Sequence, residues 1–204
     1  SEDGGDGDAG TGSGSIGLAV STLNNPFFVT LSEGAKEAAA EKDAELIVVD
    51  AGDDAAKQTN DIEDLISKNI SVLIVNPVDS DAVAPAVKDA VAKGIKVVSV
   101  DRVVNGVDVD CAIASDNVAG AEAATEYLVG LIGEDAKVAE LQGVSGASAT
   151  IDRGEGFHNV ADEKLDVVSS QTANFNRSEG MTVMENMLQA NSDIQGVFAH
   201  NDEM

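Results

Sequence analysis

From Ser15 onward, short runs rich in β-branched residues alternate along the chain with longer amphipathic segments. The short runs are predicted to be strands, and several are continuously apolar, as expected where both faces of a parallel sheet are covered. The longer segments repeat apolar residues at helical spacing and are predicted to be helices. The strands are expected at residues 16–20, 46–49, 72–75, 96–100, 111–114, 137–141, 167–171 and 197–199, and the helices at 26–42, 55–68, 82–93, 117–132, 149–161 and 177–189.

The residues between these elements agree with the assignment. Asn25 stands before Pro26, which is typical of a helix cap followed by proline at the first helical position. Gly94 follows Lys93, where a helix end calls for a left-handed residue. Strand–helix alternation with right-handed crossovers indicates an α/β fold with a doubly wound parallel sheet. Ligands of such folds lie beyond the carboxyl ends of the strands, so the residues that follow each strand are the candidates for a site.

Candidate residues for a site follow the first and the fourth predicted strands. Phe27 and Phe28 are adjacent in a polar loop of a chain that has five phenylalanines in total. They could pack the start of the helix as a hydrophobic staple, or form an aromatic wall for a ligand with apolar faces. Asp101 and Arg102 follow the fourth strand, where they could form a surface ion pair or a hydrogen-bonding fork for hydroxyl groups.

The second half of the chain offers similar candidates. Arg153 is predicted near the start of a helix, where it could contact a ligand or form a solvated salt bridge. Phe175 follows the seventh strand, and Asn201 follows the eighth. Amide, carboxylate and guanidinium groups together satisfy the donor and acceptor sides of hydroxyls, while aromatic rings cover C–H faces. The collected residues therefore suit a neutral sugar, and an analogue that lacks a hydroxyl would leave buried polar groups unpaired.

The charge balance is strongly acidic. Twelve Lys and Arg stand against 37 Asp and Glu, which gives a net charge of −25. Such a charge argues against nucleic acid as a partner, since its phosphates would be repelled, and against docking on anionic lipid through a basic patch. The long apolar segments exclude an acidic disordered chain. We interpret the charge as the acidic surface of a folded, halophilic protein that needs high salt to screen its self-repulsion.

The first 14 residues are Gly, Asp, Ser and Thr with almost nothing apolar, and are predicted to be a flexible acidic tether. They contain a match to G-x-G-x-x-G from Gly5 to Gly10, but no strand precedes it and no helix follows, so we interpret it as linker. No stretch has the pattern of a signal peptide or a membrane span, and the chain is interpreted as a mature form. Cys111 stands in an apolar run and is expected to be a small buried residue.

The search for an enzyme finds no catalytic group. His158 and His200 are the two histidines, and neither belongs to a cluster with the spacing of a metal site. Ser145 or Ser148 as a nucleophile would need a base that the sequence does not place. G-x-S-x-G, P-loop and H-E-x-x-H motifs are absent from the sequence. We expect a non-catalytic protein without cofactor or metal, in which His200 has a structural role or lies at the rim of a pocket.

Five separated blocks carry a resemblance to a known family. The sequence resembles the periplasmic sugar-binding proteins, most closely their ribose-binding members, from about Ile16 to Met204. The blocks are Ser21-Thr22-Leu23-Asn24-Asn25-Pro26-Phe27-Phe28, Asn76-Pro77-Val78-Asp79-Ser80-Asp81-Ala82-Val83, Ala114-Ser115-Asp116-Asn117, Arg153-Gly154-Glu155-Gly156-Phe157 and Phe198-Ala199-His200-Asn201-Asp202-Glu203-Met204.

The resemblance implies a two-lobed periplasmic-binding-protein fold of type I that closes on its sugar. The N-terminal lobe would comprise residues 15–114 and a partial C-terminal lobe residues 115–204, with a hinge crossing near Ala114–Asp116. The family continues past the last block, so the second lobe is expected to be incomplete. Carried over position by position, the ligand contacts would be Ser21, Asn25, Phe27, Phe28, Asp101, Arg102, Arg153, Phe175 and Asn201, with the three phenylalanines around the sugar ring.

The implied function is that of the substrate-binding component of an ABC sugar importer. The partners would be a monosaccharide, with D-ribose favoured over allose, xylose or galactose, the transporter permease and, for a signalling role, a chemoreceptor. The implied location is extracytoplasmic, with the acidic segment as the tether of a lipoprotein on the outer face of the cell membrane. Alternatives are the sugar-sensing effector domain of a transcription repressor, which the acidic N-terminal segment disfavours, a sugar-modifying enzyme, and a truncated fragment that does not bind.

Overall fold

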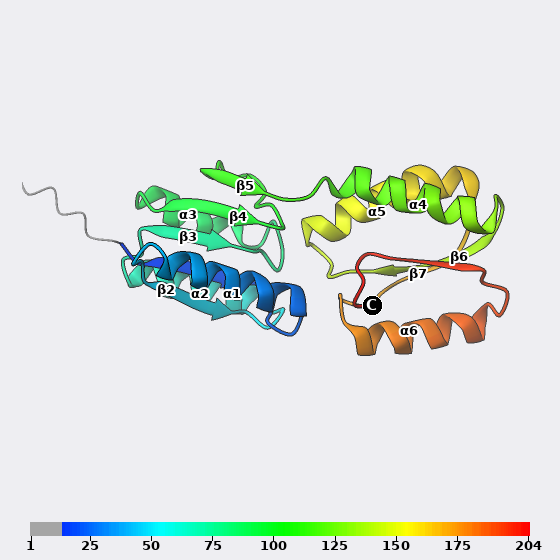
Figure 1. Cartoon of the computed structure of the whole chain (residues 1–204), viewed down its shortest axis with the longest axis horizontal. Helices are drawn as coiled ribbons and strands as arrows, with labels where there is room; N and C mark the ends of the chain where they lie inside the picture. Colours follow the sequence, from blue (N-terminus) through cyan, green and yellow to red (C-terminus); the bar gives the residue numbers. More distant parts are fainter. Residues whose placement is uncertain (1–13) are drawn as a thin grey trace, which may run out of the picture.

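The computed structural model describes residues 14–204 as two α/β units joined end to end (Figure 1). We call the unit built on the first sheet the first lobe and the other the second lobe. The segment predicted to be a tether lies outside the described residues, apart from Gly14. The stretch between β5 and α4 connects the two lobes, and the hinge was predicted in this stretch.

The first lobe is a five-stranded parallel sheet with strand order β2-β1-β3-β4-β5. Helix α1 packs against β1 and β2, whereas α2 and α3 contact each other over the opposite face. The strand order reverses between β1 and β3, which is the topological switch point of a doubly wound sheet. The elements are β1 (Ile16–Val20), α1 (Pro26–Ala40), β2 (Leu46–Asp50), α2 (Ala55–Ser67), β3 (Val72–Val75), α3 (Ala84–Ala92), β4 (Lys96–Val100) and β5 (Cys111–Ile113).

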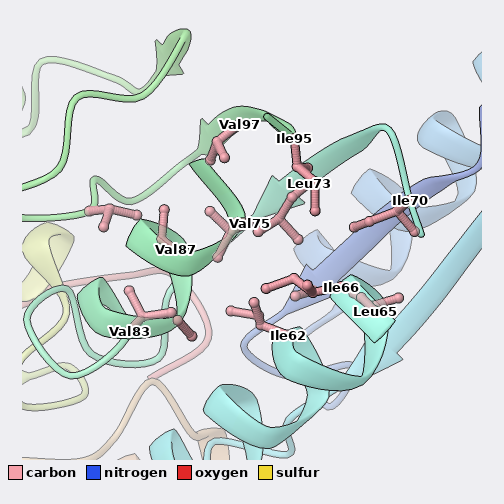
Figure 2. Close-up of a cluster of buried hydrophobic side chains, with 14 of the residues drawn as sticks. Ile62, Leu65, Ile66, Ile70, Leu73, Val75, Val83, Val87, Ile95 and Val97 are labelled. Atoms are coloured by element: carbon pink, nitrogen blue, oxygen red, sulfur yellow. The ribbon is translucent and has the colours of Figure 1, made fainter. Parts of the chain in front are cut away.

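The core of the first lobe lies between α2, α3 and the central strands (Figure 2). Ile62 and Leu65 of α2 are fully buried and lie on one helical face because they are three residues apart. Leu73 and Val75 alternate along β3 and point into the same cluster, together with Val97 of β4. The apolar residues that recur at helical spacing in α2 and at strand spacing in β3 therefore lie in one apolar layer.

The second lobe is a three-stranded parallel sheet with strand order β7-β6-β8. Helices α4 and α5 pack together on one face of this sheet, and α6 covers the other (Figure 1). Phe157 of α5 is fully buried and its ring stacks on that of Phe198 of β8, with the centroids 4.6 Å apart. The elements are α4 (Asn117–Ile132), β6 (Lys137–Gln142), α5 (Ser148–Lys164), β7 (Asp166–Thr172), α6 (Arg177–Ala190) and β8 (Gly196–Ala199).

The local signals act as predicted. The side chain of Asn25 caps α1 by accepting a hydrogen bond from the backbone N–H of Phe27 at 2.9 Å. Asp116 caps α4 in the same way, through the N–H of Ala119 at 3.0 Å. Gly94 adopts the left-handed conformation after α3, with a φ of +79°. The α/β class, the parallel sheets and their double winding agree with the sequence-based prediction.

Two predictions about burial and length differ from the structure. Cys111 is exposed rather than buried, because β5 is an edge strand that pairs with β4 alone and is exposed along its whole length. The apolar run around it predicted a strand but could not indicate that the strand lies at an edge. Helix α5 extends three residues beyond its predicted end, to Lys164, and α3 begins at Ala84, two residues later than expected.

Candidate functional site

A cavity lies between the lobes, and its lining residues follow the carboxyl ends of strands in both sheets. Asn25, Phe27 and Phe28 come from the loop after β1 and the first turn of α1. Two residues that follow β4, three that follow β7 or β8, and two in the first turns of α5 complete the lining, in agreement with the rule for doubly wound sheets. These others are Asp101, Arg102, Ala149, Arg153, Phe175, Asn201 and Asp202.

Arg102 is the charged centre of the site on the first lobe. Its side chain is buried, and one guanidinium nitrogen, Nη1, donates a hydrogen bond to the carbonyl of Pro77 at 2.8 Å. The guanidinium carbon lies 5.3 Å from the ring centroid of Phe28 and 5.4 Å from that of Phe175. These distances place the cation within reach of two aromatic faces, one from each lobe. The Nε–H of Arg102 is buried without a hydrogen-bond partner, at a residue that lines the cavity.

Asp101 stands next to this donor, with its Oδ2 3.9 Å from the Nε of Arg102. Burial raises the pKa of Asp101, while the positive charges of Arg102 and Arg153 oppose that change. Burial likewise lowers the pKa of Arg102, and the charges of Asp101 and Asp53 counteract it. Both ions therefore lack part of the solvation that water would supply, and a ligand that hydrogen-bonds to them would restore it. The φ of Asp101 is +65°, in the left-handed region that L residues rarely adopt.

Arg153 is the corresponding group of the second lobe. Its Nε donates to the side-chain oxygen of Asn117 at 2.9 Å, and its Nη1 donates to the carbonyl of His200. The guanidinium is thus held between α4 and the end of β8. Its central carbon lies 6.0 Å from the ring centroid of Phe175. Phe175 therefore has one arginine on the first lobe and one on the second within reach of its ring.

The position of Phe175 depends on a glycine. A Cβ at Gly143 would come within 2.1 Å of the Cζ of Phe175, so the ring packs directly on the backbone at the end of β6. The φ of Phe175 itself is +56°, which is rare for an aromatic residue. The strained backbone and the close approach together fix the ring between the lobes.

The two lobes contact each other beside the cavity. The N–H of Ser80 donates to the carbonyl of Gly146 at 2.9 Å, and the N–H of Ser148 donates to the Oγ of Ser80 at 3.2 Å. The Oγ of Ser148 in turn accepts from the N–H of Val103 at 3.0 Å. Gly146 has a φ of +83°, and a Cβ there would lie 2.0 Å from a carboxylate oxygen of Asp79. These contacts hold the lobes close together on one side of the cavity.

The structure brings eight of the nine sequence-predicted ligand residues to one cavity, and the exception is Ser21. Ser21 is fully buried, and its Oγ donates to the Oδ1 of Asn76 at 2.6 Å. Asn76 donates in turn to the carbonyl of Val100 at 3.1 Å. The pair therefore ties together the ends of β1, β3 and β4 beneath the site, and Ser21 does not line the cavity.

The three aromatic residues of the lining differ in their exposure. Phe27 is 57% exposed at the rim, which contradicts the alternative that it packs the helix start as a staple, while Phe28 is buried. Phe28 and Phe175 both line the cavity, and the guanidinium of Arg102 is within reach of both rings. Sequence reasoning also missed Ala149 and Asp202 in the lining. Their positions in the sequence could have indicated them, because Ala149 begins the fifth predicted helix and Asp202 directly follows Asn201.

A second cavity adjoins the first and shares Asn25, Phe28, Arg102 and Phe175 with it. Asp53 lines this second cavity with a φ of +63°. Burial raises the pKa of Asp53, and a hydrogen bond with Thr22 and the charge of Arg102 oppose the rise. Asp53 was not among the predicted site residues, because its contact with the site depends on how the loop after β2 folds back.

Other kinds of site were also sought. No group of three or more metal-ligating side chains comes together among residues 14–204. Across the same range, no helix combines the length and apolar character needed to cross a membrane.

Comparison with known proteins gives consistent results. A family model described as periplasmic binding protein domain matches residues 16–204. The ribose import binding protein RbsB of Bacillus subtilis is 54% identical over 189 residues, which cover 93% of this chain and 62% of that protein. The RbsB protein of Escherichia coli is 47% identical over 190 residues, covering 93% of this chain and 64% of its own length. The chain thus spans less than two thirds of either relative.

Solved structures of the same fold are also similar. An ABC transporter solute binding protein from Bacillus halodurans with bound myo-inositol superposes with a TM-score of 0.89 at 34% sequence identity. The match covers 96% of this chain and 69% of that one. The match therefore extends over both lobes.

Proposed function

The chain belongs to the periplasmic binding protein domain family, and on that premise we propose that it binds a neutral monosaccharide as the substrate-binding component of an ABC sugar importer. Binding is non-catalytic and consists of capture between two lobes. The relatives described above are named as binding proteins, which agrees with this role. No cofactor or metal takes part in the proposal.

The observation that carries the proposal is the environment of Arg102. A buried guanidinium with one unpartnered donor, an adjacent half-buried carboxylate and two aromatic rings line one cavity. A sugar hydroxyl is donor and acceptor together, so it can accept from Arg102 and donate to Asp101. The C–H faces of the sugar ring lie against aromatic carbon. On this reading the ligand contacts are Asn25, Phe27, Phe28, Asp101, Arg102, Arg153, Phe175 and Asn201, while Ser21 supports them from below.

D-ribose is the sugar we propose. Both RbsB relatives are named for ribose import, whereas the Bacillus halodurans protein holds myo-inositol, another neutral ring rich in hydroxyls. The chemistry of the cavity favours this class of ligand, and the names of the relatives favour ribose within it. Allose, xylose and galactose are the competing sugars.

The further parts of the proposal concern the whole protein. We propose lobes at residues 15–114 and 115–204 that close about the segment near Ala114–Asp116, with a permease as partner and a chemoreceptor as a second one. The location is extracytoplasmic, with the acidic N-terminal segment as a lipoprotein tether on the outer face of the cell membrane.

Thermal unfolding with and without sugar tests the function. In molar KCl, excess D-ribose is expected to raise the midpoint of a far-UV circular dichroism melt, because ligand at 100 times Kd stabilises the folded state by about 2.7 kcal/mol. The matched ligand 2-deoxy-D-ribose should raise it less, since a missing hydroxyl leaves a buried polar group unpaired at a cost of about 1–3 kcal/mol. A cooperative melt that is shifted by none of D-ribose, allose, xylose and galactose would contradict the proposal.

The net charge of −25 carries a separate proposal, that the protein is halophilic. We expect the unfolding midpoint to rise steeply between dilute buffer and molar KCl, because the Debye length falls to about 3 Å at 1 M salt and screens the repulsion among carboxylates. Sucrose at matched osmolality serves as the uncharged control and should not reproduce the salt effect. Complete folding in dilute buffer, with the same midpoint as in KCl, would refute the proposal.

A further inference from the structure

Both histidines of the chain contact the same buried carboxylate. Glu140 lies in β6 and is fully buried. Its Oε1 is 2.9 Å from the Nε2 of His200, and its Oε2 is 3.3 Å from the Nε2 of His158. Gln142 also donates to Oε2, at 3.0 Å. Glu140, His158 and His200 come from β6, α5 and the end of β8, so the cluster joins three elements of the second lobe.

Glu140 is ionised in this setting. Burial by itself raises its pKa, but hydrogen bonds from His200, Ser170 and Gln142 outweigh burial and lower the pKa to about 2. A buried carboxylate is tolerated only when it is hydrogen-bonded or paired with a positive charge. The protonation states of the two imidazoles therefore decide how well its charge is compensated.

The two imidazoles have different roles. The Nδ1 of His200 faces the N–H of Gly143 at 3.4 Å, an arrangement that favours the tautomer in which the Nε2–H donates to Glu140. His158 instead lies between two carboxylates, with its Nδ1 2.7 Å from Asp162 and its Nε2 facing Glu140. Only the protonated imidazole can donate from both nitrogens. Partial burial lowers the pKa of His158, but the bond to Asp162 and the charge of Glu140 outweigh it and raise the pKa above 6.5.

The cluster is connected to the cavity through His200. The backbone carbonyl of His200 accepts from Arg153, and the next residue is Asn201. Helix α5 is connected to the end of β8 at two points, and Arg153 provides the first and His158 the second. The N-terminal attachment runs through the carbonyl of His200, and the second runs through its ring, Glu140 and His158. A sugar that orders Arg153 and Asn201 would thereby order the partners of His158 as well.

We propose that Glu140 and the two histidines form a proton site that positions Arg153 and Asn201, so that sugar binding and proton binding at His158 favour each other. The inference rests on the proposed sugar-binding function and deepens it. Glu140 and His200 are positioning residues, and His158 is the group that titrates. Because linkage is reciprocal, sugar raises the pKa of His158 by the same free energy by which the proton tightens sugar binding.

The other charged and polar groups near the cluster are already engaged. Helix α4, which packs on α5, brings Glu122 and Glu126, but these bind Asn159 at 2.7 Å and Lys164 at 2.6 Å. From β7, Ser170 hydrogen-bonds to Glu140. Asp162, on α5 itself, is therefore the outer carboxylate that sets the pKa of His158 together with Glu140.

The sign of the pH dependence follows from these groups. The pKa of His158 is raised in the folded protein, so its favourable contribution is present at pH below 6.5 and is lost as pH rises through the folded pKa. Sugar affinity should follow the same course. By calorimetry between about pH 6 and pH 9, which brackets a raised imidazole pKa, we expect the Kd to increase roughly fivefold, the lower end of typical coupling between two sites.

Three variants separate the contributions. His158→Gln should make the Kd independent of pH in this range, because glutamine keeps a hydrogen-bonding group but does not titrate. Asp162→Asn should shift the midpoint of the profile to lower pH, since it removes one of the two carboxylates that raise the pKa of His158. The matched control is Asp193→Asn, which removes an exposed carboxylate of the same lobe bound to Lys137, and its profile should equal that of the unmodified chain.

Proton NMR of the two imidazoles provides the decisive readout. D-ribose is expected to raise the pKa of the resonance that is lost in His158→Gln. Sugar binding with an unchanged pKa and a flat Kd profile would overturn the inference and leave the proposed function intact. If no sugar binds at any pH, the proposed function fails. Arg153→Gln then tests the connection without ligand, and an unchanged His158 pKa in that variant would overturn the inference as well.

Discussion

Replacing Arg102 with methionine is expected to weaken D-ribose binding by roughly 10- to 150-fold, because a hydrogen bond that involves a charged group contributes about 1.5–3 kcal/mol. The change removes the unpartnered donor and leaves Asp101 without its positive neighbour. It also removes the cation held between Phe28 and Phe175. Isothermal calorimetry in molar KCl measures the effect directly.

Two further variants define what Arg102 contributes. Lys96→Met is the control, because Lys96 is mostly exposed and pairs with Asp110 on the surface, where an ion pair contributes at most about 1 kcal/mol. Arg102→Lys keeps the charge but loses the planar group that stacks on the rings, and is expected to recover only part of the affinity. A Kd for Arg102→Met within about threefold of the unmodified chain would refute the central place of Arg102, since that change is below 1 kcal/mol.

The largest effect on stability is expected for Phe157→Ala. Phe157 is fully buried in the second lobe and stacks on Phe198, so truncation leaves a cavity and removes an aromatic contact. Substitutions of this kind cost about 3–5 kcal/mol. Urea unfolding followed by circular dichroism in molar KCl is expected to show this loss in the transition of the second lobe.

Tyr127→Ala provides the comparison for this prediction. Tyr127 lies on α4 and is 72% exposed, so its truncation is expected to change stability by less than about 0.5 kcal/mol. A loss below about 1 kcal/mol for Phe157→Ala would mean that the second lobe repacks around the gap and that its core does not depend on this ring.

Much of the fold could be predicted because its signals are local. The continuous apolar runs indicated buried parallel strands, and Asn25 and Gly94 marked helix ends through capping and a left-handed turn. Helix α5 was predicted too short because its last turn carries polar and charged residues, which periodicity does not assign to a helix. Cys111 was placed in the core because an apolar run looks the same in a central strand and an edge strand.

The candidate site was predictable to the extent that it obeys the rule for strand ends. Phe28, Arg102, Arg153 and Asn201 follow strands or begin helices at the carboxyl edges of the two sheets, which is where a ligand lies in this topology. Ser21 follows the same rule by position, but its side chain turns inward to Asn76. Position along the chain determines which edge a residue reaches, whereas the rotamer depends on neighbours that are distant in sequence.

The sequence by itself determined the α/β class, the order of strands and helices, the acidic surface and the set of residues at the sheet edges. Each of these depends on composition or on spacing within a few residues. Only the tertiary structure decided that Arg102 is buried between Phe28 and Phe175, and that Glu140 lies between both histidines. These arrangements join residues far apart in the chain, and their energies come from burial, which arises only when the elements pack together.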